Sequence, residues 1–402
     1  MTLPAAEPAP GPRLGAFGAL WFCYFASIGI FNPFAPLWFK ELGFSTLAIG
    51  SIASLQAWTR VLGPYGWGWL GDRGGSRVRL LKLAAWFSLA GACGLLWVRG
   101  YTAVAWVTAL LFLANSGIVP LTEASLAHHL TSGGGLDAGR YGRVRVWGSL
   151  GFIVAVVVLG LVFEHGGIGL FPWAIALAYL SLLAMTLRLP PGSESGGSRE
   201  GAPAVLGVLR QGAVRWFFVS VFFTVLAHSS VYTFFSLYLD AKGHGKSTVG
   251  TLWAVAVALE IAFFWWQGRV FGLLSPHAWL QWAAGASVLR FVVTAAFGAW
   301  LPLLVFAQAL HLLSFAAHHA ACIALITRWF PGALRGRGQA LYTVLGYGFS
   351  GVLGGVGGGW ISSRLGLAAV FWVAALAALL GWWCARHSQR LDVRSDEAAV
   401  RP

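Results

Sequence analysis

The chain has 402 residues, of which 58% are hydrophobic and 10% are charged, and its mean hydropathy is +0.72. A soluble domain carries about a quarter charged residues, so this composition excludes a soluble fold and indicates a polytopic membrane protein. The formal net charge is +14. Its basic residues gather beside apolar stretches, so the expected partner is the lipid bilayer and no nucleic-acid partner is expected.

Apolar stretches long enough to cross a bilayer, about 20 residues each, follow one another along the whole chain. The first is too long for a signal peptide and lacks a small-residue cleavage site. The sequence therefore predicts an all-α integral membrane protein. Twelve spans are expected, at about residues 14–39, 46–70, 80–98, 103–127, 143–163, 168–187, 214–239, 247–267, 277–298, 302–327, 338–359 and 365–385.

The longest polar stretch between spans, RLPPGSESGGSREGAPA at residues 188–204, follows the sixth span. Its Pro, Gly and Ser content is typical of a flexible linker. Residues 139–151 and 334–348 each place Arg and Gly before a Gly-containing span, so the two halves echo each other, as in many secondary transporters. The predicted organisation is a six-helix half at 1–187, a cytoplasmic linker at 188–212 and a second six-helix half at 213–402.

The distribution of basic residues predicts the orientation. Most of the 27 lysines and arginines lie on the side that holds the linker and both termini. Basic loops remain in the cytoplasm, so both termini are expected there, in a bacterial-type inner membrane. The four cysteines lie in spans without a CxxC pair, and no metal site or disulfide is expected. The basic residues on the other side are Lys40, Arg99, Lys242, Lys246 and Arg364.

A Gly-rich loop, GWGWLGDRGGSRVRLLK at residues 66–82, joins the second and third spans. Glycine permits the tight chain reversal that such a loop needs. The loop resembles the signature of the major facilitator superfamily, G-x-x-x-D-R-x-G-R-[KR], and Arg77 is slightly displaced from the pattern. The resemblance implies a conformational gate formed by Gly68, Asp72, Arg73 and Arg77.

Further stretches narrow the resemblance. Residues 23–45, 142–151, 287–291 and 310–315 are similar to lactose permease and its relatives, most closely to the 3-phenylpropionate permease-like branch. The resemblance covers nearly the whole chain. It implies the major facilitator fold, with twelve helices in two pseudo-symmetric halves, and a transporter that functions as a monomer.

Ionisable residues inside spans are candidate functional residues, because burying a charge in a membrane is costly. The resemblance makes Glu123 and Arg145 substrate contacts, with a structural ion pair as the alternative. Arg60 is left over when the deep charges are paired, and a substrate carboxylate could supply its anion. Two alternatives remain open: Arg60 pairs with Glu123 or Glu260, or its side chain extends toward water. Further proposed contacts are Asn32, Gln56 and His228, and Trp58, Trp265 and Trp266 are candidates to hold an aromatic ring.

The candidate proton-coupling residues lie in the second half. Glu260 is surrounded in sequence by apolar residues, which favour the neutral carboxyl group, whereas a nearby guanidinium favours the carboxylate. Arg290 and His311 are expected to tune it. Where the resemblance expects an acid, three residues after His311, the chain has Ser314. Regular helix geometry predicts that His311 and His318 share one face and that His319 points away.

These features predict a proton symporter that imports a small organic solute by alternating access. The favoured substrate is an aromatic or other organic acid of the phenylpropionate type. A lactose-, oligosaccharide- or nucleoside-type symporter is the alternative substrate class, and a membrane sensor is the alternative outside transport. No enzyme motif such as H-E-x-x-H, G-x-S-x-G or a P-loop occurs. No enzymatic activity and no cofactor are expected.

Overall fold

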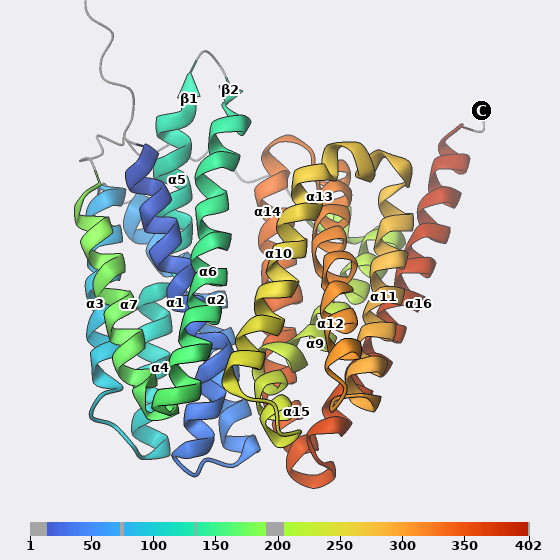
Figure 1. Cartoon of the computed structure of the whole chain (residues 1–402). Coiled ribbons are helices and arrows are strands. Elements are labelled where there is room, and N and C mark those ends of the chain that lie inside the picture. Colours follow the sequence, from blue (N-terminus) through green and yellow to red (C-terminus); the bar gives the residue numbers. More distant parts are fainter. Residues whose placement is uncertain (1–13, 73–75, 133–134, 190–204, 401–402) are drawn as a thin grey trace, which may run out of the picture.

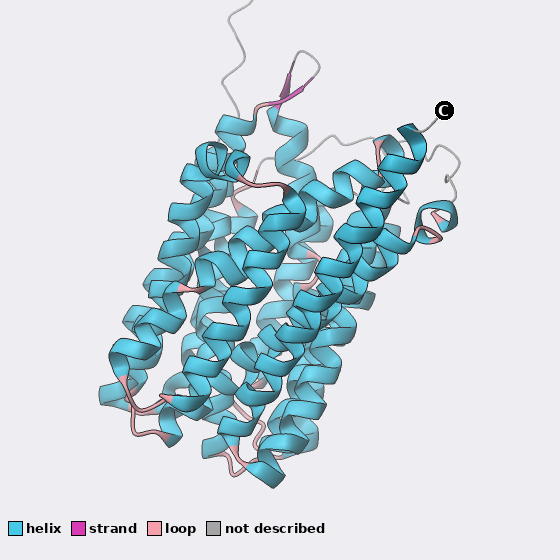
Figure 2. Ribbon diagram, turned by 90° about the vertical axis from the view of Figure 1, so that its right-hand side faces the viewer, coloured by secondary structure: helices cyan, strands magenta, loops and turns pink. Residues whose placement is uncertain are grey.

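The computed structural model describes residues 14–72, 76–132, 135–189 and 205–400, and they form a bundle of long helices (Figures 1 and 2). One small hairpin, β1 (Thr131–Ser132) paired antiparallel with β2 (Gly135–Leu136), lies at one end of the bundle. The helices of the first half are α1 (Leu14–Glu41), α2 (Thr46–Asp72), α3 (Arg77–Gly94), α4 (Tyr101–Asn115), α5 (Ile118–Leu130), α6 (Ala138–Gly166), η1 (Ile168–Leu170) and α7 (Phe171–Leu187).

The second half begins after the linker, of which residues 190–204 lie outside the described residues. Its first three long helices are α9, α10 and α11. Two π-helical segments, η3 and η5, interrupt later spans. The elements are α8 (Leu206–Leu209), α9 (Gly212–Ala241), α10 (Lys246–Val270), η2 (Phe271–Leu273), α11 (Pro276–Ala296), α12 (Leu301–Ala309), η3 (Leu312–Ala317), α13 (His318–Trp329), η4 (Gly332–Leu334), α14 (Arg335–Leu341), η5 (Tyr342–Phe349), α15 (Ser350–Leu365) and α16 (Leu367–Val400).

The helices confirm the all-α membrane architecture. Within the described residues, nine helical segments are long and apolar enough to cross a membrane. The helices α2, α3 and α11 run beside them and pack against α15, α7 and α16, which gives twelve crossings in two halves. These three are less apolar because they carry residues such as Arg60 in α2, Lys82 in α3 and Arg290 in α11.

The two halves meet through glycines at one end of the bundle. We call the end where α7 stops and α9 starts the linker side, and the opposite end the far side. A Cβ on Gly50 of α2 would overlap the Gly355 carbonyl oxygen of α15, and a Cβ on Gly250 of α10 would overlap the Val156 carbonyl oxygen of α6. Figure 1 shows α6 and α10 side by side toward the far side and separated toward the linker side. Small residues thus permit backbone contact between the halves.

Polar contacts reinforce this far-side junction. The Lys40 Nζ lies 2.6 Å from Asp240 Oδ2, and Ser54 Oγ donates to the Val352 carbonyl oxygen at 2.7 Å. The Ser247 amide, in the first turn of α10, donates to Glu164 Oε2 of α6 at 3.2 Å. A carboxylate at a helix N-terminus satisfies free amides and interacts favourably with the helix dipole. The structure is therefore a state closed on the far side.

Candidate functional site

Two cavities lie between the halves and share Asn32 of α1 and Tyr232 of α9. We call the first the Arg60 pocket, and its lining includes Asn32, Gln56, Arg60, Ser229, Tyr232 and Thr233. We call the second the Glu260 pocket, and its lining includes Ser149, His228, Glu260, Arg290, Gln308 and His311. Helices of both halves line each pocket, so relative motion of the halves would change both.

The described lining of the Arg60 pocket contains one guanidinium group, that of Arg60. The Arg60 side chain is exposed on α2, and none of the described residues lies at ion-pair distance from it. One turn earlier, Gln56 Nε2 donates to Asn32 Oδ1 at 3.4 Å, which links α2 to α1. Hydroxyl groups of Tyr232 and Thr233 line the opposite wall. A guanidinium beside amide and hydroxyl groups suits a ligand with a carboxylate.

Arg290 is the buried cation of the second pocket, and only 2% of the residue is exposed. Its guanidinium donates to Gln308 Oε1 at 2.7 Å and to Ser314 Oγ at 3.2 Å, and it contacts His311 Nδ1 at 2.9 Å. All three partners are uncharged in these contacts. Sequence reasoning overlooked Gln308, although a glutamine one turn before His311 in an apolar span is a visible signal.

His311 lies between Arg290 and Glu260. A guanidinium has no acceptor, so His311 Nδ1 must accept from Arg290, and the proton of the neutral ring lies on Nε2. That nitrogen faces Glu260 Oε2 at 3.6 Å, which is beyond hydrogen-bond length but close enough for electrostatic attraction. Arg290 therefore reaches Glu260 through His311 and not by direct contact.

A second path from Arg290 leads to His228. Ser314 Oγ accepts from Arg290 and lies 3.4 Å from His228 Nε2, while His228 Nδ1 lies 2.8 Å from the Thr224 carbonyl oxygen. Because a carbonyl only accepts, Nδ1 carries the hydrogen and Nε2 accepts from the serine hydroxyl. Ser314, at the position where the family resemblance expects an acid, thus connects the buried arginine to α9.

The histidines beyond His311 differ from the sequence prediction. The ring of His311 stacks on Phe315 with centroids 4.9 Å apart, and Phe315 stacks on His319 at 6.5 Å. His318 instead packs on Cys322 and is not among the described residues that line either pocket. The predicted shared face of His311 and His318 is wrong, because the π-helical turn of η3 is wider than an α-turn and brings the residue eight positions on into phase.

Glu123 and Arg145 lie close together, as expected for adjacent antiparallel helices. Glu123 Oε1 lies 3.8 Å from Arg145 Nε and accepts from the Tyr141 hydroxyl at 3.3 Å. The Arg145 guanidinium also lies over the rings of Trp21 and Phe25. Phe25 lines the Glu260 pocket, whereas Glu123 and Arg145 do not appear in the described lining of either pocket. The pair therefore flanks the pocket on its linker side.

Two tryptophans predicted near the substrate lie elsewhere. Trp265 and Trp266 of α10 are 79% and 52% exposed and are absent from the described pocket linings, so the structure does not bring them to the two pockets. Apolar periodicity does not distinguish a lipid-facing ring from a cavity-facing ring. Trp58 is partly exposed and contacts Phe349 across the two halves, with ring centroids 5.9 Å apart.

The predicted gate lies at the end of α2. Gly68 is in its last turns, Asp72 is its final residue, and Arg77 begins α3. Arg73 lies outside the described residues. The end of α2 that carries Gly68 and Asp72 and the start of α3 at Arg77 lie on the linker side, in the first half.

Twelve crossings in two halves, with cavities between them that are lined in part by polar side chains, define a multi-pass membrane transporter. The sequence matches the model of the MFS_1 like family over residues 16–373, and the chain belongs to that family. It is a transporter of the major facilitator superfamily in the phenylpropionate-like branch.

Named relatives and solved structures agree with this class. The chain is 32% identical over 375 residues to the "Probable 3-phenylpropionic acid transporter" of Escherichia coli (strain K12), covering 89% of this chain and 93% of the relative. It is 26% identical over 388 residues to the "Maltose permease" of Geobacillus stearothermophilus, covering 92% and 93%. The crystal structure of a mutant of the nucleoside transporter NupG superposes with a TM-score of 0.82 at 16% identity, covering 93% and 99%. This last likeness shows the fold.

Proposed function

We propose that the protein is a proton-coupled symporter that imports a small organic acid, best an aromatic acid of the phenylpropionate type. The proposal rests on one observation: a cationic group and a carboxyl group lie in two separate, adjoining pockets. Arg60 offers a cation without an ion-pair partner among the described residues, and Glu260 offers a carboxyl group beside a buried cation. One group is suited to an anionic substrate and the other to a proton.

The substrate part of the proposal rests on the Arg60 pocket. A carboxylate can accept two parallel hydrogen bonds from a guanidinium, and Gln56 and Asn32 lie within the same cavity. Phe31 and Phe39 line its wall and provide apolar contacts for a ring. We place His228 on the substrate side of the Glu260 pocket, and Glu123 with Arg145 at the approach from the linker side. The related phenylpropionic acid transporter supports the choice of substrate class.

The proton part rests on Glu260. Its carboxyl group faces the neutral His311, which Arg290 holds in one tautomer. Movement of α10 relative to α11 and η3 would change that distance, and with it the balance between the neutral carboxyl group and the carboxylate. His318 is a less direct candidate because it lies outside the pocket lining.

The transport cycle would alternate access across the far-side junction. In the proposed orientation the linker and both termini are cytoplasmic, and the structure is the state closed to the outside. Gly68, Asp72, Arg73 and Arg77 would form the opposite gate, on the cytoplasmic side. Bacterial relatives support an inner-membrane location, and we propose a monomer without a cofactor or enzymatic activity.

The test is uptake of 3-phenylpropionate by proteoliposomes under an imposed pH gradient. We expect Arg60→Gln to weaken apparent affinity roughly 10- to 100-fold, because a charged hydrogen bond contributes about 1.5–3 kcal/mol. Arg60→Lys keeps the charge but not the planar donor pair. Its apparent affinity should therefore lie between those of the wild-type protein and Arg60→Gln. Thermal unfolding of each purified variant controls for misfolding. Unchanged affinity in both well-folded variants would contradict the anion site.

The alternative substrate class has support of its own, from the maltose permease relative. Competition by unlabelled maltose, lactose and uridine in the same assay separates the classes. Inhibition by a neutral sugar or nucleoside, with none by monocarboxylates, would favour that alternative. Absence of uptake of every solute, with retained binding, would favour a sensor.

A further inference from the structure

A third cavity lies on the outer surface of the second half, away from both pockets. It is a groove between α11, the end of α12 with η3, and α16. Its lining includes Trp282, Gly285, Leu289, Leu313, Leu379 and Trp382, and it shares no described residue with the Arg60 or Glu260 pockets. The groove is therefore not part of the proposed transport path.

The groove faces the bilayer. Trp282 is 63% exposed, and Leu289 and Leu379 are also exposed at its rim. A Cβ built on Gly285 meets no atom within 4 Å, so the glycine deepens the groove without serving a helix contact. In a bilayer, acyl chains are the apolar material around the outer surface of the helices, so they would fill an apolar depression there.

The α16 face that borders the groove becomes cationic toward the linker side. Leu379, Trp382, Arg386 and Arg390 follow one another at spacings of three or four residues, which places them on one helical face. The Arg386 guanidinium lies over the Trp382 ring at 5.0 Å. Arg386 and Arg390 are both exposed, and neither forms an ion pair with a side chain that the structure describes.

Aromatic residues lie on the adjoining side of α16, toward α9. Trp383 stacks on His387 at 5.7 Å, and Trp216 at the start of α9 contacts both rings. Tryptophans concentrate at the level of lipid headgroups. Because Arg386 lies three residues beyond Trp383 on α16, we place it at headgroup level and Arg390 one turn beyond. Nearby, the Gln281 side chain donates to Gln389, which ties α11 to α16 at this end of the groove.

We propose that this groove is a binding site for an anionic phospholipid. An acyl chain would lie against Gly285, Leu289 and Leu379, and the headgroup phosphate would contact Arg386 and Arg390. Charge complementarity selects an anionic headgroup over a zwitterionic one, because two cations at the surface attract net negative charge. The occupant is a bilayer lipid because the apolar groove and the cationic pair are continuous along one face.

The test is native mass spectrometry of the detergent-purified chain titrated with phosphatidylglycerol or phosphatidylcholine. We expect tighter binding of phosphatidylglycerol by the wild-type protein. In the double variant Arg386→Gln/Arg390→Gln, that preference should fall roughly thirtyfold, since each surface cation contributes about a factor of five. Gly285→Leu fills open space and should weaken binding of both lipids without lowering thermal stability.

The matched control is Arg79→Gln/Arg143→Gln, which removes two exposed arginines from linker-side helix ends of the first half. It should keep the preference for phosphatidylglycerol. The proposal is overturned if wild-type protein binds both lipids equally, if the control loses the preference as strongly as the α16 variant, or if Gly285→Leu leaves binding of both lipids unchanged. None of these outcomes depends on transport, so the lipid site and the proposed function are tested separately.

Discussion

Arg290 determines which ring nitrogens of the neighbouring histidines carry a hydrogen and which accept one. Its donors make His311 Nδ1 an acceptor, and through Ser314 it directs a second donor toward His228 Nε2. Neither histidine can take a further proton in these contacts without losing a partner or facing the guanidinium. For this reason we propose the carboxyl group of Glu260 as the proton-binding group of this pocket.

At this residue we predict that Glu260→Gln separates exchange from accumulation. The amide resembles the protonated carboxyl group and cannot release a proton, so substrate binding and counterflow should persist while uphill uptake under a pH gradient is lost. The measurement compares the two assays in the same proteoliposomes. Full uphill accumulation by the variant would place coupling elsewhere, with His311 the next residue to test.

At the scale of elements, glycines set the distance between the halves. A side chain on Gly250 would overlap backbone of α6, whereas Gly268 on the same helix α10 has open space around it. Alanine at an unhindered helix position is more favourable than glycine by about 0.5–1 kcal/mol. The same substitution should therefore have opposite effects at the two positions.

We predict that Gly250→Ala lowers both the thermal unfolding temperature and the transport rate, because it forces α10 from α6 in the far-side-closed state. Gly268→Ala should unfold at the same temperature or higher and transport normally. Thermal unfolding in detergent and initial uptake rates measure both effects. Equal behaviour of the two variants would show that close approach at Gly250 does not stabilise this state.

The hydropathy of the sequence was sufficient to place the membrane-spanning helices. Regular helix geometry was not sufficient to predict which side chains share a face. The twelve expected spans all coincide with helices, since about 20 apolar residues in sequence require a crossing. The pairing of Glu123 with Arg145 followed from adjacency of their helices. The positions of His318 and His319 did not follow, because nothing in LLSFAA signals the π-helical turn. The positions of Trp265 and Trp266 did not follow either, for another reason. Lipid and the protein interior are both apolar, so the sequence does not show which of the two an aromatic ring faces.

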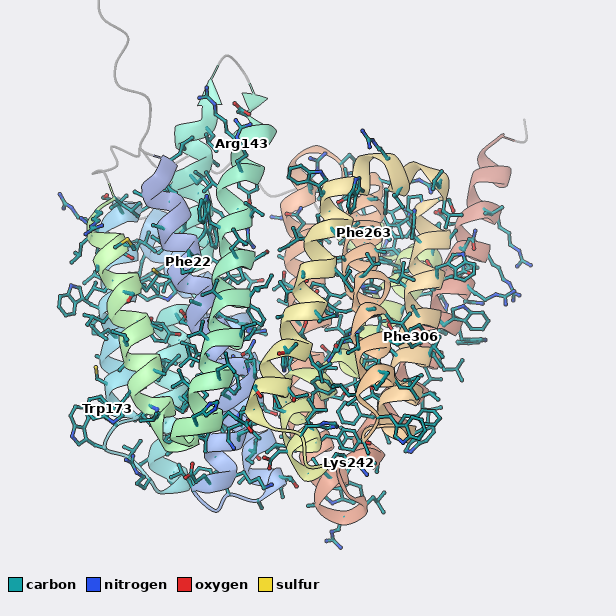
Figure 3. The ribbon with its side chains drawn as sticks, in the orientation of Figure 1. Phe22, Arg143, Trp173, Lys242, Phe263 and Phe306 are labelled. Carbon is teal, nitrogen blue, oxygen red and sulfur yellow. The ribbon has the colours of Figure 1, made fainter. Side chains whose placement is uncertain are left out.

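At the scale of the whole molecule, charge is distributed unevenly between the two ends. Figure 3 shows Arg143 toward the linker side and Lys242 at the far side. Sequence counting places the basic excess on the linker side, and basic loops remain cytoplasmic. The far-side ion pair of Lys40 with Asp240 would then face the cell exterior.

We predict that a cysteine at Lys242 is labelled by an impermeant thiol reagent in intact cells and that one at Ser195 is not. Both are placed in a background without the native cysteines. Ser195 lies outside the described residues, so this prediction rests on the sequence alone; Lys242 is exposed. Permeabilised cells, in which both should react, provide the control. The reverse labelling pattern would invert the topology.

The scarcity of acids between the halves has an electrical consequence. Glu260 is the acidic residue among the described lining of the two pockets. One proton on Glu260 and one monovalent acid anion would cross together as a neutral load. Membrane voltage contributes about 2.3 kcal/mol per charge per 100 mV, and a neutral load receives none of it. Uptake would then follow the pH difference alone, and clamping the voltage at zero with valinomycin and potassium would leave the accumulation ratio unchanged.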